Sequence, residues 1–185
     1  MFDKFFEINC RQFHKVSKDQ FANAVKDKYE NNYMSTDEFN SFLDKVYEDI
    51  SLPKRATTGS AAYDFYSPYR FSLSPQEEIL IPSGIKASMN YRDVLLFFPR
   101  SSLGFKYYAR FANTIPVVDS DYYNNINNEG HIFIKIRNES IDKTMHIDKG
   151  EAFCQAMFIN YLITNDDECE AERTGGIGST NKKEI

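Results

Sequence analysis

The sequence predicts a mainly β domain of the antiparallel jelly-roll type, with a helical hairpin in front of it. From Leu52 onward the apolar runs are short, β-rich, and separated by Pro, Gly, Asn and Asp. The run at 131–137, HIFIKIR, alternates as a half-buried strand does. Because no helical pattern separates these runs, they favour an antiparallel sandwich or jelly roll.

The first fifty residues follow a helical period instead. Ser17 is the expected N-cap of one helix, with Gln20 as the other half of a capping box, and Ser35 or Thr36 caps a second helix. The apolar residues at helical spacing are Phe21, Val25 and Tyr29, followed by Phe39, Phe42, Leu43, Val46 and Ile50. Such a stripe usually faces a core, so we expect a helical hairpin over about 17–50 whose aromatic face is a packing surface.

The totals describe one ordinary domain. The chain has 185 residues, of which 42% are hydrophobic, and this is enough for one core. A net charge of −5 argues against a protein that binds duplex nucleic acid by neutralising phosphates. No apolar run approaches the ~18 residues that a membrane helix needs. Three cysteines without a CxxC pair indicate reduced thiols, and we therefore expect a cytoplasmic protein. From the charge and the lack of a long apolar run, we expect no nucleic-acid partner and no membrane partner.

Three segments are expected along the chain. Residues 1–51 form a strand and helical-hairpin extension, residues 52–164 form the β domain, and residues 165–185 form a polar, Gly-rich end. A terminal segment without a core pattern is flexible by default. A bound triphosphate would give this one a reason to become ordered.

Two segments combine arginine, hydroxyls and glycine in a way that suits a phosphate. PRSSLG (99–104) directly follows an apolar strand, and Arg100 together with backbone N–H groups can hold an oxyanion. ERTGGIGST (172–180) repeats this composition, although it lacks the Gly-Lys-Ser/Thr of a P-loop. Each segment taken alone also fits a polar turn or tail.

Two further stretches supply carboxylates. Asp64 lies in the aromatic run AAYDFYS, where a carboxylate is usually at a turn or paired and could instead lie near a Mg²⁺ ion that keeps its waters. In VVDSDYYNN (117–125), Asp119 and Asp121 alternate, so in an extended chain they point to opposite sides. One of them can therefore act as a general base, and the other is then structural. Tyr122 is placed to stack on a sugar or a ring.

Five segments, taken in order, resemble the motifs of the homotrimeric dUTP pyrophosphatase (dUTPase) family. They are AAYDFYS, PRSSLG, NTIPVVDSDYY, KGEAFCQAMF and RTGGIGST, and the resemblance covers about residues 52–181. It implies a jelly-roll or β-clip subunit in a threefold trimer whose active sites are shared between subunits. It also implies hydrolysis of dUTP to dUMP and pyrophosphate, with Mg²⁺ on the triphosphate.

The resemblance assigns a role to each matching residue. Asp119 would activate the water that attacks the α-phosphorus, and Arg100 would hold this carboxylate. Tyr122 would pack against the deoxyribose and leave no room for a 2′-hydroxyl, and Asp64 would hold a water of the Mg²⁺ shell. The other implied substrate contacts are Ser101, Ser102 and Gly104 to the phosphates, Asn113 to uracil, Gln155 to the α-phosphate, and Arg173, Gly176, Ser179 and Thr180 in a lid over the γ-phosphate from a neighbouring subunit.

The chain departs from the family pattern in a few places. Ala62 replaces the usual Gly of the first motif, and YNNINNE lengthens the hairpin after Tyr122. We expect the longer hairpin to change the loop shape with activity retained. In the fifth motif, which is one residue shorter, Ile177 stands where an aromatic residue commonly covers uracil, and Asn181 replaces the last Gly. The N-terminal hairpin lies outside the family core and is a candidate surface for a partner protein.

Three functions are compatible with these residues. The first is an active dUTPase, the second a catalytically weak dUTP-binding regulatory protein, and the third a dCTP deaminase of the same fold. Retention of Asp119 favours the first, because a pure binder needs no base. The deaminase is disfavoured because Asp-x-Asp-Tyr and PRSSLG resemble the hydrolase branch.

Overall fold

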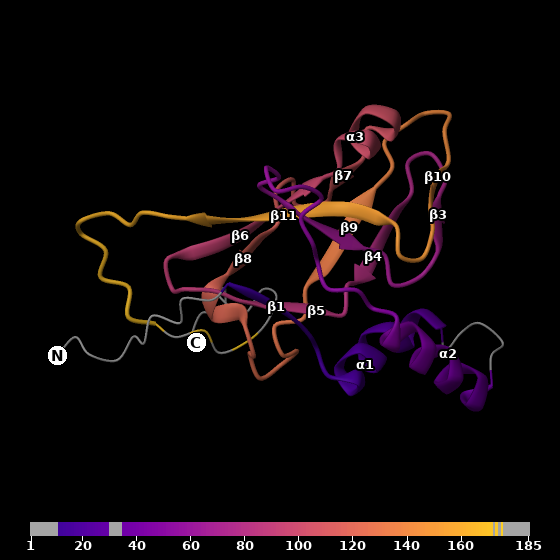
Figure 1. Ribbon diagram of the computed structural model, residues 1–185, viewed down its shortest axis with the longest axis horizontal. Helices are drawn as coiled ribbons and strands as arrows, with labels where there is room; N and C mark the ends of the chain where they lie inside the picture. The colour runs from indigo at the N-terminus through magenta and orange to yellow at the C-terminus, as the bar shows by residue number, and fades with distance from the viewer. Residues whose placement is uncertain (1–10, 30–34, 172, 174, 176–185) are drawn as a thin grey trace, which may run out of the picture.

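The computed structural model describes residues 11–29, 35–171, 173 and 175, and it has a β structure with helices at two ends (Figure 1). The predicted mainly β fold is confirmed. The strands are β1 (Gln12–Lys15), β2 (Tyr63–Tyr66), β3 (Phe71–Leu73), β4 (Glu78–Pro82), β5 (Ile85–Ser88), β6 (Asp93–Pro99), β7 (Arg110–Phe111), β8 (Val117–Asp119), β9 (Phe133–Arg137), β10 (Met145–Ile147) and β11 (Ala152–Asn160). The helices are α1 (Lys18–Tyr29), α2 (Thr36–Glu48), α3 (Ser101–Tyr107) and the 3-10 turn η1 (Ser120–Tyr122).

In the described residues, the strands pair in antiparallel sheets that are joined by one core. The largest sheet has the order β2-β11-β6-β8, and a second has the order β4-β9-β7. Two strand pairs, β1-β5 and β10-β3, complete the architecture. Strand β11 lies at the centre of the largest sheet, where Phe153, Cys154 and Ala156 are fully buried. The largest sheet therefore provides a rigid base for side chains on both of its faces.

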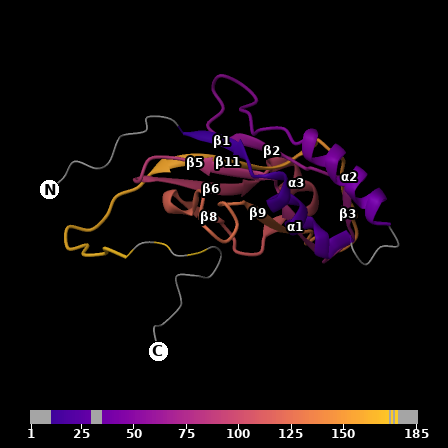
Figure 2. The ribbon, with the colours of Figure 1, turned by 90° about the horizontal axis from the view of Figure 1, so that it is seen from below.

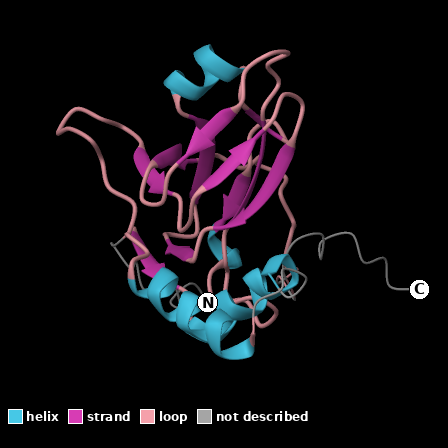
Figure 3. Ribbon diagram, turned by 90° about the vertical axis from the view of Figure 1, so that its right-hand side faces the viewer, coloured by secondary structure: helices cyan, strands magenta, loops and turns pink. Residues whose placement is uncertain are grey.

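The two N-terminal helices contribute to the same core. They lie at one end of the β structure, opposite α3 (Figure 3). At Gly84, just before β5, an added Cβ would come within 2.4 Å of Ile50 Cδ1, so the helical segment approaches the sheet very closely. The helical residues in the shared buried cluster are Phe21, Val25, Leu43 and Val46. The prediction that the aromatic and aliphatic stripe is a packing surface is confirmed.

The two helices are capped differently. Ser35 forms a complete capping box with Glu38 at the start of α2. At α1, the Ser17 hydroxyl accepts from the Gln20 backbone N–H at 3.1 Å. The expectation that the Gln20 side chain completes this box is wrong, because the Ser17 N–H donates to Glu129 Oε2 at 2.9 Å. The Glu129 carboxylate, from a distant loop, occupies the position that the Gln20 side chain was expected to fill. The helix dipole favours a negative charge at this position.

Helix α3 is a short helix within the β domain, where the sequence pattern indicated only a polar turn. Its residues Leu103 and Tyr107 are spaced by four and are both buried, which favours one helical turn over an open loop. Tyr108 ends the helix in the left-handed conformation, with φ +52°. In the described part of the chain, no helix is long and apolar enough to cross a membrane.

Candidate active site

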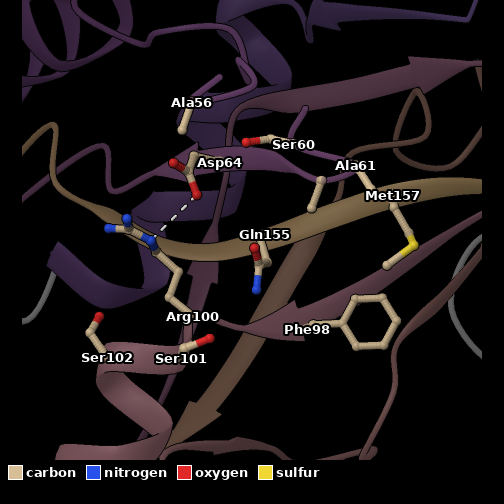
Figure 4. Close-up of a pocket in the computed structure, with 11 residues that line it drawn as sticks. Ala56, Ser60, Ala61, Asp64, Phe98, Arg100, Ser101, Ser102, Gln155 and Met157 are labelled. Atoms are coloured by element: carbon tan, nitrogen blue, oxygen red, sulfur yellow. Dashed lines mark ion pairs between the residues drawn. The ribbon is translucent and has the colours of Figure 1, made fainter. Parts of the chain in front are cut away.

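The predicted site residues that the structure describes line two separate pockets, except for Gly104 in α3, which lines neither. The first, which we call the Arg100 pocket, is a cavity of about 500 Å³ next to α3 (Figure 4). It brings together residues from three of the five sequence motifs: Asp64, Arg100, Ser101, Ser102 and Gln155.

Strand register explains how the Arg100 pocket is built. Gln155 on β11 pairs with Asp64 on β2 and with Phe98 on β6. Residues opposite one another in adjacent strands lie on the same face of a sheet. These three side chains therefore form a row across the largest sheet, and the row lies beneath the start of α3.

Arg100 is held in this pocket by two contacts. Its Nε lies 3.3 Å from Asp64 Oδ1 (dashed line in Figure 4), and its Nη1 donates to the backbone oxygen of Ala152 at 3.1 Å. Ser101 and Ser102 follow it in the first turn of α3 with exposed side chains. The remaining guanidinium N–H groups and the two hydroxyls provide donors that suit a phosphate.

The second pocket, which we call the Asp119 pocket, is a cavity of about 300 Å³ at the end of β8. Its polar lining residues are Asn113, Asp119, Tyr122 and Arg173. Apolar residues complete the lining: Phe97, Pro116, Val117, Val118, Ile132 and Phe133. A cavity that combines apolar walls with a few convergent polar groups is typical of a small-molecule site.

Asp119 and Asp121 do not point to opposite sides, contrary to the expectation from the extended pattern. The chain bends into η1 directly after Asp119. As a result both carboxylates reach the guanidinium of Arg173, with Nη2 donating to Asp119 Oδ2 at 2.6 Å and Nε donating to Asp121 Oδ1 at 2.7 Å. Arg173 arrives there because the chain leaves β11, extends away from the sheet and returns to the end of β8 (Figure 2).

The electrostatics of Asp119 suit a proton acceptor. Partial burial raises the pKa of this carboxyl above its ordinary value, the Arg173 guanidinium opposes the rise, and the Asp121 carboxylate adds to it. The side chain of Asp119 is half-exposed, whereas that of Arg173 is largely buried. Asp119 is therefore accessible to water, and it shares the Arg173 guanidinium with Asp121.

Tyr122 forms one wall of the Asp119 pocket, and its hydroxyl is fully engaged. The hydroxyl donates to the backbone oxygen of His131 at 2.9 Å and accepts from Asn128 Nδ2 at 2.8 Å. Arg173 lies 5.8 Å from the ring centroid. The ring is 8% exposed, so its orientation is set by contacts from the loop that follows it.

The two pockets open on opposite sides of β6. Phe97 lines the Asp119 pocket and Phe98 lines the Arg100 pocket. Successive side chains of a strand point to opposite faces of its sheet. Within one chain, Arg100 therefore contacts Asp64 and lies in a different pocket from Asp119. Of the residues expected in the lid, Gly176, Ser179 and Thr180 lie outside the described residues.

The sequence pattern did not single out three residues that support Tyr122. Asn128 and Glu129 lie in the longer hairpin that follows it, and His131 comes directly after this hairpin. The high density of asparagine in YNNINNEG was a usable signal, since Asn side chains close turns on their own backbone. Asn125 does so here, because its Nδ2 donates to the Tyr122 backbone oxygen at 2.9 Å.

Comparisons with known proteins identify the family of the chain. The dUTPase family model matches residues 48–181. The deoxyuridine 5'-triphosphate nucleotidohydrolase of Lactococcus lactis is 44% identical over 133 residues, which are 71% of this chain and 88% of that protein. The enzyme of the same name from Dictyoglomus turgidum is 34% identical over 147 residues, covering 75% of this chain and 95% of that protein.

Solved structures give the same result. The dUTPase from Streptococcus mutans superposes with a TM-score of 0.57 at 40% identity, over 64% of this chain and 91% of that one. The dUTPase from phage phi11 of S. aureus gives a TM-score of 0.59 at 17% identity, over 90% of this chain and 100% of that one, and so shares the fold. These neighbours have the jelly-roll fold, which confirms the predicted fold class. The chain belongs to the dUTPase family.

Proposed function

We propose that this protein hydrolyses dUTP to dUMP and pyrophosphate, with Asp119 as the base that activates the attacking water. The observation that carries the proposal is the Asp119 pocket, in which a half-exposed carboxylate, the Asn113 amide and the Tyr122 ring line one cavity. Relatives named deoxyuridine 5'-triphosphate nucleotidohydrolase support the same reaction. In this proposal Asn113 reads the uracil edge and Tyr122 excludes a 2′-hydroxyl.

The reaction also needs donors for the triphosphate, and we assign them to the Arg100 pocket. Arg100, Ser101, Ser102, Gly104 and Gln155 would bind and orient the phosphates, because phosphoryl transfer depends mainly on positioning and on neutralising charge. Gln155 Nε2 already donates to the Pro99 backbone oxygen at 3.2 Å, which aims its amide along the pocket.

The complete site is proposed to form between subunits of a trimer. The support is geometric, since base and phosphate donors lie in pockets on opposite sides of β6 in one chain. In a trimer, the Arg100 pocket of one subunit would complete the Asp119 pocket of another, and there Arg100 would hold Asp119. Arg173 would exchange its carboxylate partners for the γ-phosphate, together with Gly176, Ser179 and Thr180 of the lid.

Magnesium on the triphosphate belongs to the same proposal. In the described residues, no three His, Cys, Asp or Glu side chains lie together as a metal site. This fits Mg²⁺, which keeps several waters and is commonly held through substrate phosphates with one or two carboxylates. Asp64, on the floor of the Arg100 pocket, would hold one of those waters. The ion would neutralise charge on the triphosphate. A structural Mg(II) ion is described for the phage phi11 enzyme.

A cytoplasmic location is also proposed. Cys154 and Cys169 are free thiols in the described structure. Free thiols are typical of a reducing compartment.

Asp119→Asn tests the proposed reaction. The amide keeps the size of the side chain and cannot accept the proton, so we expect turnover to fall roughly 10³-fold with dUTP binding retained. Pyrophosphate release from dUTP, dCTP, dTTP and UTP, with and without Mg²⁺, measures activity and substrate choice together. Asp142→Asn, at an exposed turn, is the matched control. Wild-type turnover in Asp119→Asn would contradict the assignment of the base.

A further inference from the structure

Two segments that lie outside the five motifs contact each other: the start of α1 and the longer hairpin that follows Tyr122. Besides its N–H, which donates to Glu129 Oε2, the Ser17 hydroxyl donates to Glu129 Oε1 at 2.5 Å. Ser17 directly precedes α1, and Glu129 ends the longer hairpin, 112 positions further along the chain. We call residues 123–130 the Asn hairpin. Helix α1 is therefore capped by a side chain of the Asn hairpin.

The Asn hairpin in turn surrounds Tyr122. Asn128 donates to the phenol oxygen and Asn125 donates to the backbone oxygen of Tyr122. Asn125 Nδ2 also donates to Asn128 Oδ1 at 2.7 Å, which links the two amides. A phenol has one donor and few acceptor sites, and here the donor reaches the His131 carbonyl. Buried hydrogen bonds of this kind fix a ring in one orientation.

Glu129 connects the Asn hairpin to α1 and to the sheet. Besides Ser17, its carboxylate contacts Lys86 Nζ on β5 at 3.2 Å, and the same ammonium donates to Asn124 Oδ1 at 2.8 Å. The Glu129 backbone is left-handed, with φ +58°. At the next residue, Gly130, an added Cβ would lie 2.5 Å from the Tyr122 backbone oxygen. The hairpin thus packs directly against the backbone of Tyr122. With so little space between them, a shift of Glu129 would also move Tyr122.

His131 forms a second connection between α1 and the pocket. Its ring is buried, and Nε2 accepts from the Gly84 backbone N–H at 2.8 Å. The Gln20 amide of α1 lies 3.5 Å from Nδ1, and the Phe21 ring lies 6.2 Å away between centroids. On the other side, the ring contacts Phe133, which lines the Asp119 pocket, at a centroid distance of 4.4 Å.

We infer that α1 and the Asn hairpin together form a brace that positions the Tyr122 ring, with Ser17, Asn128 and Glu129 as positioning residues for sugar selectivity. The inference rests on the proposed role of Tyr122 and deepens it. The N-terminal extension then contributes to choosing a deoxyribose over a ribose, although none of its described residues lines either pocket.

Two serine caps provide a matched test. Ser17→Ala removes the hydroxyl that links α1 to Glu129, whereas Ser35→Ala removes the equivalent hydroxyl of α2, whose partner Glu38 lies in the same helix. Both variants lose an N-cap, so we expect similar falls in the unfolding midpoint. Dissociation constants of dUDP and UDP, measured by calorimetry, give the sugar selectivity without turnover. We expect Ser17→Ala to lower the UDP/dUDP ratio by roughly 2- to 30-fold, and Ser35→Ala to leave it unchanged.

Glu129→Asn provides a second variant that keeps the hairpin backbone. Asparagine favours the left-handed conformation, while its shorter side chain withdraws from Ser17 and Lys86. The same loss of selectivity is expected. The inference is overturned if neither Ser17→Ala nor Glu129→Asn changes the ratio, or if Ser35→Ala changes it equally. Tyr122→Ala distinguishes a failure of the proposed Tyr122 role from a failure of the brace. If Tyr122→Ala keeps the wild-type ratio, Tyr122 does not select the sugar. If Tyr122→Ala lowers the ratio and the Ser17 and Glu129 variants leave it unchanged, only the brace is overturned.

Discussion

The Arg100 pocket and the Asp119 pocket are held in place by different kinds of structure. The Arg100 pocket rests on strand register, since Asp64, Gln155 and Phe98 lie in one row across three neighbouring strands. The Asp119 pocket lies at the edge strand β8, and its Tyr122 wall depends on the Asn hairpin and on contacts with α1. The polar residues of the Arg100 pocket are therefore held mainly by the strands that carry the family motifs. The Asp119 pocket, at the sheet edge, is also supported by segments outside those motifs.

Arg100→Lys is expected to have the largest effect on this comparison. A lysine ammonium lacks the planar fork that spans Asp64 Oδ1 and the Ala152 oxygen, so kcat/KM for dUTP should fall roughly 100-fold. The preference for dUTP over UTP should stay the same, because Arg100 lies apart from Tyr122 within one chain and, in the proposed trimer, would contact Asp119 and the phosphates of a neighbouring site. Arg70→Lys, in an exposed ion pair with Asp148, is the control and should be near neutral. A change in sugar preference in Arg100→Lys would show that Arg100 also influences the Tyr122 wall.

His131 provides a test of how the Asp119 pocket is supported. Burial lowers the pKa of His131 to about 4 from an ordinary 6.5, and the Glu129 carboxylate opposes this shift. Between these two pH values the unfolded chain binds a proton that the folded chain does not, so stability falls as the pH drops from 6.5 to 4. The loss amounts to about 3 kcal/mol.

His131→Asn should remove this component of the pH dependence. Urea unfolding at intervals between pH 4 and 6.5 measures it, and the slope of the free energy of unfolding against pH should be smaller than in the wild type. Protonation of Glu129, whose pKa is lowered by Ser17 and Lys86, contributes in both proteins. His146→Gln, at an exposed position on β10, is the control and should keep the wild-type slope. An unchanged slope in His131→Asn would mean that the ring titrates normally.

The same contrast explains what could be predicted from the sequence. Five residues that line the Arg100 pocket were predicted as site residues, because they belong to short motifs on or beside regular strands: Asp64, Arg100, Ser101, Ser102 and Gln155. The brace could not be predicted, since Ser17 and Glu129 are 112 positions apart and Gln20 offered a local partner that satisfied the capping rule. The fold places the Glu129 carboxylate at the N-terminus of α1, and this distant residue accepts the hydrogen bond that Gln20 was predicted to accept.

The prediction that Asp119 and Asp121 point to opposite sides was wrong for a different reason. The alternation rule assumes an extended chain, and a 3-10 turn of three residues was enough to break it. Nothing in VVDSDYYNN other than its Asp and Asn content signals that bend. The consequence for chemistry is that Asp121 is not a bystander, because it shares Arg173 with the proposed base.

Asp121→Asn measures that consequence and is expected to have the smallest effect. The like charge of Asp121 adds to the raised pKa of Asp119, so its removal should lower that pKa. A base works when deprotonated, and therefore the acidic limb of the kcat/KM profile for dUTP should move to lower pH, with the rate at neutral pH nearly unchanged. Asp121→Glu keeps the charge and should keep the wild-type profile. If the limb of Asp121→Asn instead moves to higher pH, loss of the Arg173 contact outweighs the lost repulsion, and Asp121 acts by holding the arginine against Asp119.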